Sequence, residues 1–159
     1  MIRPADFNEI SEKILSKIDQ EEPSIRTSIG RKYYYLYLEL RETIKVNVNR
    51  ELRELLDEEY SREESLHCVL REVLFIISKR VKDKELQRQF KKAANAIKIL
   101  RRLRNDSDYK LNRTISNQNL NNARYDVSDV EEILSKISQL GVENLTQYLQ
   151  EAVEKCRKR

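Results

Sequence analysis

The stretch KELQRQFKKAANAIKILRRLRNDSD, residues 84–108, decides the fold of this chain. Its apolar residues recur every three or four positions, the spacing that places side chains on one face of an α-helix. This face consists of Leu86, Phe90, Ala93, Ile97 and Leu100. Because the stretch contains neither glycine nor proline, it predicts one long helix that buries this face and exposes its charged side.

The same period extends outward over most of the chain. The expected helices cover residues 4–20, 24–56 with a bend near 47–49, 61–78, 84–108, 128–140 and 143–156. Two capping boxes, Ser61 with Glu64 and Ser128 with Glu131, mark helix starts. Gly141 marks a helix end. Residues 112–126 are polar and rich in asparagine, which favours a loop.

These elements predict an all-α protein, a single helical domain over residues 1–159 built as an antiparallel up-down bundle of five to six helices. Residues 1–22 form its N-terminal helix and 24–111 its core helices. The polar loop at 112–126 follows, and 127–159 hold the C-terminal helices with a basic tail.

Composition excludes several classes of protein. The 159 residues include 2 Gly, 2 Pro and no Trp, which argues against a turn-rich β-sandwich. Two isolated glycines cannot supply the repeated glycines of a Rossmann or P-loop site. The chain has 1 His, His67, so histidine-dependent hydrolase and metal chemistry must use that residue. We expect no metal and no cofactor.

Localisation and cysteine state follow from equally simple features. The sequence has no apolar run near the roughly 20 residues that a membrane span needs, and its start lacks the pattern of a signal peptide. We therefore expect a cytoplasmic protein with no membrane contact. Cys68 and Cys156 are far apart in the sequence, and cytosolic proteins rarely keep disulfides, so both are expected to be free thiols.

Positive charge gathers in the second half of the chain. Residues 1–70 hold 11 basic and 15 acidic side chains, whereas residues 71–159 hold 20 and 12. Such a basic stretch is the electrostatic footprint of a nucleic-acid binder, although a solvated helix face has the same composition. The candidate RNA- or nucleotide-binding residues are Lys79, Arg80, Arg88, Lys91, Lys92, Lys98, Arg101, Arg102, Arg104 and Asn105.

One charged residue falls on the apolar stripe itself. Continuing the stripe beyond Leu100 leads to Arg104, and a buried guanidinium must be paired. Asp108, one helical turn later, is the expected partner. A second unusual feature is the tyrosine-rich segment 33–37, in which Tyr34 and Tyr37 share a face beside the inward stripe. These two tyrosines predict a dimer or partner surface, with packing inside one bundle as the alternative.

Two segments together resemble the HEPN-domain family. They are IRTSIGRKYYYLYLELRE, residues 25–42, and LRRLRNDSDYKLNRTISNQNLNNARYDVSDVEEIL, residues 100–134. The resemblance implies a helical, homodimeric protein that acts on or near RNA, in toxin–antitoxin, CRISPR-associated or phage-defence systems. Catalytic members of this family place a His four to six residues after an Arg and cleave RNA without metal.

In this chain Tyr109 stands five residues after Arg104, where such a His would be expected. The unperturbed pKa is about 10 for a phenol and about 6.5 for an imidazole, so the phenol of a tyrosine such as Tyr109 is the poorer proton shuttle at neutral pH. We therefore expect a non-catalytic domain that binds RNA, a nucleotide or a partner protein. The alternatives are a metal-independent ribonuclease and a binding partner of a minimal nucleotidyltransferase. The catalytic candidates are Arg104, Tyr109, Asp108 and His67.

Overall fold

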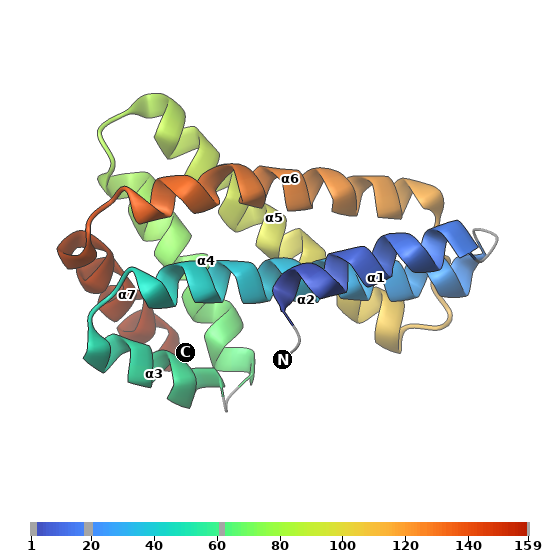
Figure 1. The fold of residues 1–159 in the computed structure, drawn as a ribbon, viewed down its shortest axis with the longest axis horizontal. Coiled ribbons are helices and arrows are strands. Elements are labelled where there is room, and N and C mark those ends of the chain that lie inside the picture. Colours follow the sequence, from blue (N-terminus) through green and yellow to red (C-terminus); the bar gives the residue numbers. More distant parts are fainter. Residues whose placement is uncertain (1–2, 18–20, 61–62, 159) are drawn as a thin grey trace.

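A computed structural model describes residues 3–17, 21–60 and 63–158. Over these ranges the chain forms seven helices and no strand, which confirms the all-α prediction (Figure 1). The helices are α1 (Pro4–Lys17), α2 (Glu22–Val46), α3 (Arg50–Tyr60), α4 (Glu63–Arg80), α5 (Lys84–Tyr109), α6 (Asn117–Ser138) and α7 (Val142–Arg157).

The long helix α2 is the axis of the bundle. It runs along the length of the molecule, with α1 and α6 beside it and α5 behind (Figure 1). Its apolar stripe, which includes Ile29, Leu36 and Leu40, is fully buried among these neighbours. Helix α5 packs in turn against α4 and α6. Of its predicted apolar stripe, Phe90, Ala93, Ile97 and Leu100 are buried and Leu86 is half-buried. None of the described helices has the length and apolar character needed to cross a bilayer.

The expected helix over residues 24–56 is two helices. Helix α2 ends at Val46, and α3 begins at Arg50. The Asn47 amide donates to the Thr43 carbonyl at 2.8 Å, and the Asn49 side-chain oxygen accepts from the Leu52 N–H at 3.0 Å. Asparagine side chains compete in this way with the regular helical bonds. The predicted bend is therefore a complete break.

The predicted loop over residues 112–126 was wrong from residue 117 onward, because α6 begins at Asn117. The Asn119 side-chain oxygen accepts from the Ser116 N–H at 2.9 Å, so asparagine here starts a helix. Leu120 and Ala123 are buried at helical spacing. The proposed cap at Ser128 consequently lies inside α6, whereas Gly141 does separate two helices, with a φ of +80°.

Two further expectations concern the third predicted helix. Helix α4 begins at Glu63, but the capping box proposed for Ser61 and the Glu64 side chain lies outside the described residues.

The prediction of free thiols is wrong. Cys68 of α4 and Cys156 of α7 form a disulfide across a sequence separation of 88, with Cα atoms 6.0 Å apart. Helices α4 and α7 pack against each other, so distance along the chain was a poor guide to distance in space.

Loss of the disulfide should destabilise the protein. A crosslink between residues this far apart in the sequence reduces the conformational entropy of the unfolded chain. Such bonds contribute about 2–4 kcal/mol to the free energy of unfolding. The variant Cys68→Ala/Cys156→Ala should therefore show a free energy of unfolding lower than that of the oxidised protein by about this amount, measured by urea denaturation. The reduced wild type should resemble the variant, and equal stability with and without reductant would contradict the crosslink.

Candidate anion-binding site

Arg104 links the C-terminal end of α5 to α2. Its Nε lies 2.8 Å from Oδ2 of Asp108, so the expected ion pair is confirmed. Its Nη2 donates to the Tyr34 hydroxyl at 2.5 Å, and its Nη1 donates to the Asn105 side-chain oxygen at 3.1 Å. The Arg104 side chain is 15% exposed. The charge that falls on the apolar stripe is thus paired within the chain, as its position required.

Aromatic rings complete the surroundings of Arg104. Its guanidinium carbon lies 5.2 Å from the ring centroids of both Tyr34 and Tyr109, within the range of cation–π attraction. From α2, Arg26 also donates to the carbonyls of Asp106 and Ser107, at 3.2 and 2.9 Å. These contacts fix the last turns of α5 against α2.

His67 lies deeper, on α4, and is only 6% exposed. The Tyr33 hydroxyl lies 2.5 Å from its Nδ1, and the Tyr37 ring is 4.4 Å away between centroids. Burial, reinforced by the positive charges of Arg101 and Arg104, lowers the pKa of His67 to about 3. The imidazole is therefore neutral at physiological pH and lacks the imidazolium proton that a general acid would give.

The two tyrosines expected on a partner surface have different environments. Tyr37 is 4% exposed and belongs to the core of the chain, stacked on Tyr33. Tyr34 is half-buried and bonded to Arg104. A side chain buried in the core cannot contact a second molecule, so Tyr37 is not part of a partner surface. The expectation of a partner contact is therefore limited to Tyr34 and its surroundings.

Three of the four catalytic candidates line one pocket. Its wall includes His67, Arg104 and Tyr109, together with Tyr33, Arg101, Asn105 and Lys110. Asp108 lies on the other side of Arg104, in a separate pocket with Gly30 and Tyr34. A methyl group built on Gly30 would be 3.5 Å from Asp108, so α2 and α5 approach closely at this point.

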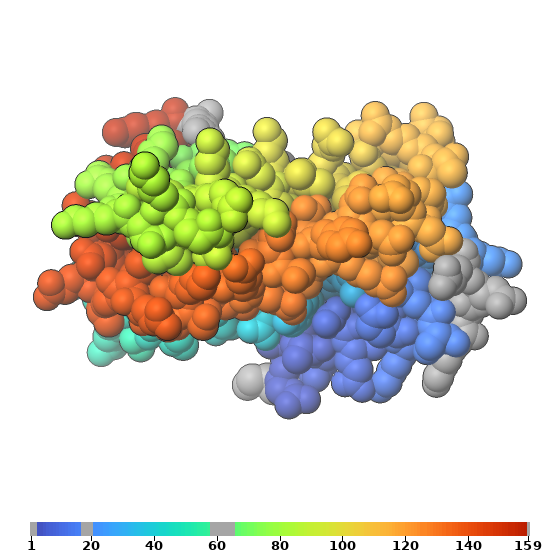
Figure 2. All heavy atoms as spheres, turned by 90° about the horizontal axis from the view of Figure 1, so that it is seen from above, coloured from blue at the N-terminus to red at the C-terminus, as the bar shows by residue number. Residues whose placement is uncertain are grey.

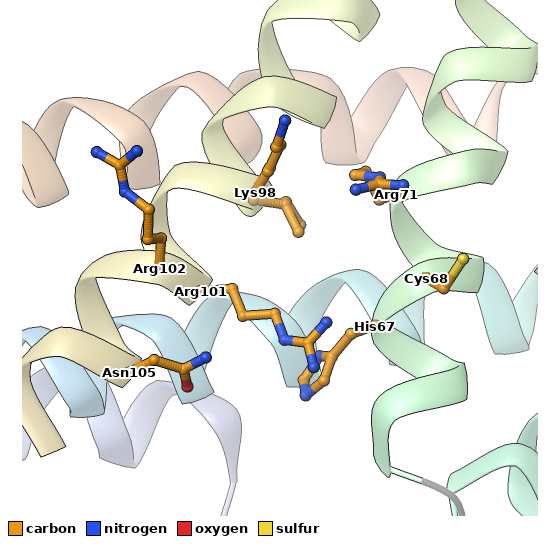
Figure 3. A pocket seen from close by; sticks show the side chains of 8 residues that line it. His67, Cys68, Arg71, Lys98, Arg101, Arg102 and Asn105 are labelled. Atoms are coloured by element: carbon orange, nitrogen blue, oxygen red, sulfur yellow. The ribbon is translucent and has the colours of Figure 1, made fainter. Parts of the chain in front are cut away.

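A second pocket lies between α4 and α5 (Figure 3). It shares His67, Arg101 and Asn105 with the first. It has a volume of about 350 Å³ and is lined by His67, Cys68, Arg71, Ile97, Lys98, Arg101, Arg102 and Asn105. The Arg101 guanidinium lies beside the His67 ring, with Arg71 further along α4 (Figure 3). Among the described residues of this lining there is no carboxylate.

The line along which α4 and α5 pack together is called the seam below. A third pocket lies on this seam, near the turn that joins the two helices. Its lining consists of Phe75, Ser78, Lys79, Lys84, Gln87, Arg88 and Lys91. It too is lined by basic side chains, with no Asp or Glu among the described residues that form it. The seam between α4 and α5 thus carries positive charge at both its turn end and its middle.

Ion pairs divide the predicted binding residues into two groups. Arg80, Arg88, Lys92 and Arg104 each have a carboxylate partner, at 3.3, 2.8, 2.7 and 2.8 Å. For Lys79, Lys91, Lys98, Arg101 and Arg102, no carboxylate of the described residues lies within ion-pair distance. The second group therefore keeps its charge available to a ligand.

Sequence reasoning missed Arg71, Tyr33 and Lys110 as members of this region. Arg71 follows His67 by one helical turn, so it lies on the same face of α4 and points toward α5. The spacing of four residues between His67 and Arg71 is the feature of the sequence that could have identified Arg71 as a member of this site. No group of three or more His, Cys, Asp or Glu side chains that could hold a metal occurs in the part of the chain that the structure describes.

Truncation of Arg104 should lower stability. The variant Arg104→Ala removes the ion pair with Asp108 and one hydrogen bond to the Tyr34 hydroxyl, and we expect a loss of about 1–3 kcal/mol in the free energy of unfolding. Arg50→Ala is the matched control, since Arg50 is 90% exposed and also pairs with a carboxylate four residues later. An equal effect of the two variants would contradict a structural role for Arg104.

The low pKa of His67 predicts a pH dependence. In the unfolded chain its pKa is near 6.5, so between about pH 6.5 and pH 3 the unfolded state binds more protons, and the free energy of unfolding falls as pH falls. Between pH 8 and pH 5, the free energy of unfolding of the wild type should fall by about 2 kcal/mol more than that of His67→Gln. The proton NMR signal of the His67 ring should also show no inflection between pH 5 and 8.

Comparisons with known proteins give relatives without an assigned activity. No family model and no solved structure matches the sequence. The chain is 38% identical over 117 residues to an uncharacterized protein of Methanocaldococcus jannaschii. The match covers 70% of this chain and 65% of that relative, so the chain spans just under two thirds of the relative's length. It is 29% identical over 159 residues to a second uncharacterized protein of that organism, covering 92% of this chain and 87% of the relative.

Proposed function

We propose that this chain is a non-catalytic, HEPN-like domain that binds RNA through its phosphates along the seam between α4 and α5. The observation that carries the proposal is the lining of the two pockets on this seam. Neither lining contains a carboxylate of the described residues, and none lies within ion-pair distance of the lining residues Lys79, Lys91, Lys98, Arg101 and Arg102. Uncompensated positive charge of this kind is how proteins attract and hold nucleic-acid backbones.

The basic residues of α5 also have a suitable arrangement. Lys84, Lys91, Lys98 and Arg102 follow one another at intervals of seven and four, so they share one face of the helix. A helix rises about 1.5 Å per residue, and this row therefore extends over roughly 27 Å. Helix α5, in yellow-green, lies at the surface beside α6 (Figure 2). Because phosphate contacts carry no sequence information, weak sequence preference is expected.

The surroundings of Arg104 favour binding over cleavage. The position expected for a catalytic His holds Tyr109, and a phenol is a poorer proton shuttle than an imidazole. His67 lines the same pocket but is buried and neutral. Ribonuclease activity is the second candidate function, since Arg104, Tyr109 and His67 do share one pocket. The proposal includes the homodimer, the defence or toxin–antitoxin setting and, as an alternative, a nucleotidyltransferase partner, all from the HEPN resemblance.

RNA binding should depend on salt and on the unpaired seam residues. Affinity for a single-stranded RNA oligonucleotide should fall with salt, with a log–log slope of about −0.7 for each neutralised phosphate. The variant Lys91→Glu/Lys98→Glu/Arg102→Glu should bind more weakly, with a slope smaller in magnitude by roughly 2. The measurement is fluorescence anisotropy at several salt concentrations in the presence of a chelator.

The control for this experiment is Lys13→Glu/Arg50→Glu/Lys158→Glu, which changes the net charge equally at exposed sites on or beside α1, α3 and α7. Unchanged affinity in the seam variant, or equal loss in the control, would contradict the proposal. The RNA should also remain intact. Metal-free cleavage that is abolished by both Arg104→Ala and Tyr109→Phe, with the fold preserved, would establish the ribonuclease instead.

A further inference from the structure

The pocket between α4 and α5 holds positive charge that the described part of the chain does not neutralise. Lys98, Arg101 and Arg102 line it and have no carboxylate of the described residues within ion-pair distance. Arg71 enters from the opposite helix, and among the described carboxylates it pairs with its neighbour Glu72, at 3.2 Å. Two helices thus present four cationic side chains to one pocket.

The depth of these groups distinguishes this pocket from a basic surface. Arg101 is half-buried, whereas Lys98 and Arg102 are exposed at the rim. Neutral His67 and the amide of Asn105 also line the pocket. A partly desolvated guanidinium without a counter-ion is unfavourable, and a bound anion would relieve that cost.

The number of cations indicates the kind of anion. An internal phosphate of RNA has one negative charge, whereas a terminal phosphate has a second pKa near 6 and carries about −1.5 to −2 at neutral pH, with three accepting oxygens. Guanidinium groups donate to such oxygens in pairs. A volume of about 350 Å³ is within the range of small-ligand sites, which begins at about 300 Å³.

We propose that this pocket, formed by His67, Arg71, Lys98, Arg101, Arg102 and Asn105, binds a terminal phosphate monoester of a nucleotide or an RNA end. The inference rests on the proposed RNA-binding function and adds a preference for phosphorylated ends. Arg101 and Arg71 hold the phosphate, and Lys98 and Arg102 cover it from the rim. The rest of the ligand extends into the adjoining pocket, which shares His67, Arg101 and Asn105.

The test compares one RNA oligonucleotide with a 5′-phosphate, with a 3′-phosphate and with neither. We expect a phosphorylated end to improve affinity by about tenfold or more, since several charge-assisted bonds are gained. In Arg71→Gln/Arg101→Gln this preference should disappear. The matched control Arg80→Gln/Arg88→Gln changes one arginine on each of the same two helices outside the pocket and should keep the preference.

The one histidine of a tag-free chain gives an independent readout. Adenosine monophosphate and inorganic phosphate should shift the ring proton signals of His67 and raise its pKa, because a bound anion favours the imidazolium, whereas adenosine should do neither. Saturation by adenosine monophosphate at the concentration required for phosphorylated RNA would identify a free nucleotide as the ligand. Tighter binding of the RNA would identify its end.

Two outcomes would overturn the inference: equal affinity for phosphorylated and unphosphorylated RNA, or no response of His67 to phosphate monoesters. Salt-dependent RNA binding that persists without end preference would leave the proposed function intact and remove only this pocket. If Arg71→Gln/Arg101→Gln fails to fold, the exposed pair Lys98→Gln/Arg102→Gln should reduce the preference, and an unchanged preference in that folded variant would also overturn the inference.

Discussion

The pairing of Arg104 is the constraint on which the rest of the site depends. A guanidinium on the apolar stripe of α5 must be satisfied inside the bundle, and Asp108, Asn105 and Tyr34 do so. Because Tyr34 belongs to α2, the same contacts hold the end of α5 against the central helix. They also fix a positive charge beside His67, which helps to keep that imidazole neutral. The same charge therefore holds α5 against α2 and adds to the effects of burial and of Arg101, which are the larger causes of the low pKa of His67.

The sequence was sufficient where the relevant interactions are local. The apolar stripe of α5 and the ion pair from Arg104 to Asp108 follow from spacings of three and four residues, which helix geometry converts directly into neighbours. The basic face of α5 could be predicted for the same reason. What spacing could not show is which cations keep their charge free. Lys92, for example, pairs with Asp129 of α6, 2.7 Å away but distant in sequence.

The errors have the same physical origin. Local rules describe asparagine as a loop former, yet the Asn119 side chain accepts from the N–H of Ser116, the N-cap residue of α6, and burial of Leu120 and Ala123 against the bundle overrides the turn preference. Redox compartment suggested free thiols, whereas packing of α4 on α7 places Cys68 and Cys156 within bonding distance. Both outcomes depend on tertiary contacts that no local window contains.

The disulfide and the Arg104 contacts stabilise opposite walls of the same seam. Cys68, which follows His67 directly, is linked to α7, so the helix that carries His67 and Arg71 is anchored where it lines the pocket. Across the seam, α5 is held by Arg104. Uncompensated cations repel one another, and their mutual repulsion favours separation of the two helices. Holding such charges close requires other stabilising contacts, and this structure provides one on each wall: the Cys68–Cys156 disulfide and the contacts of Arg104.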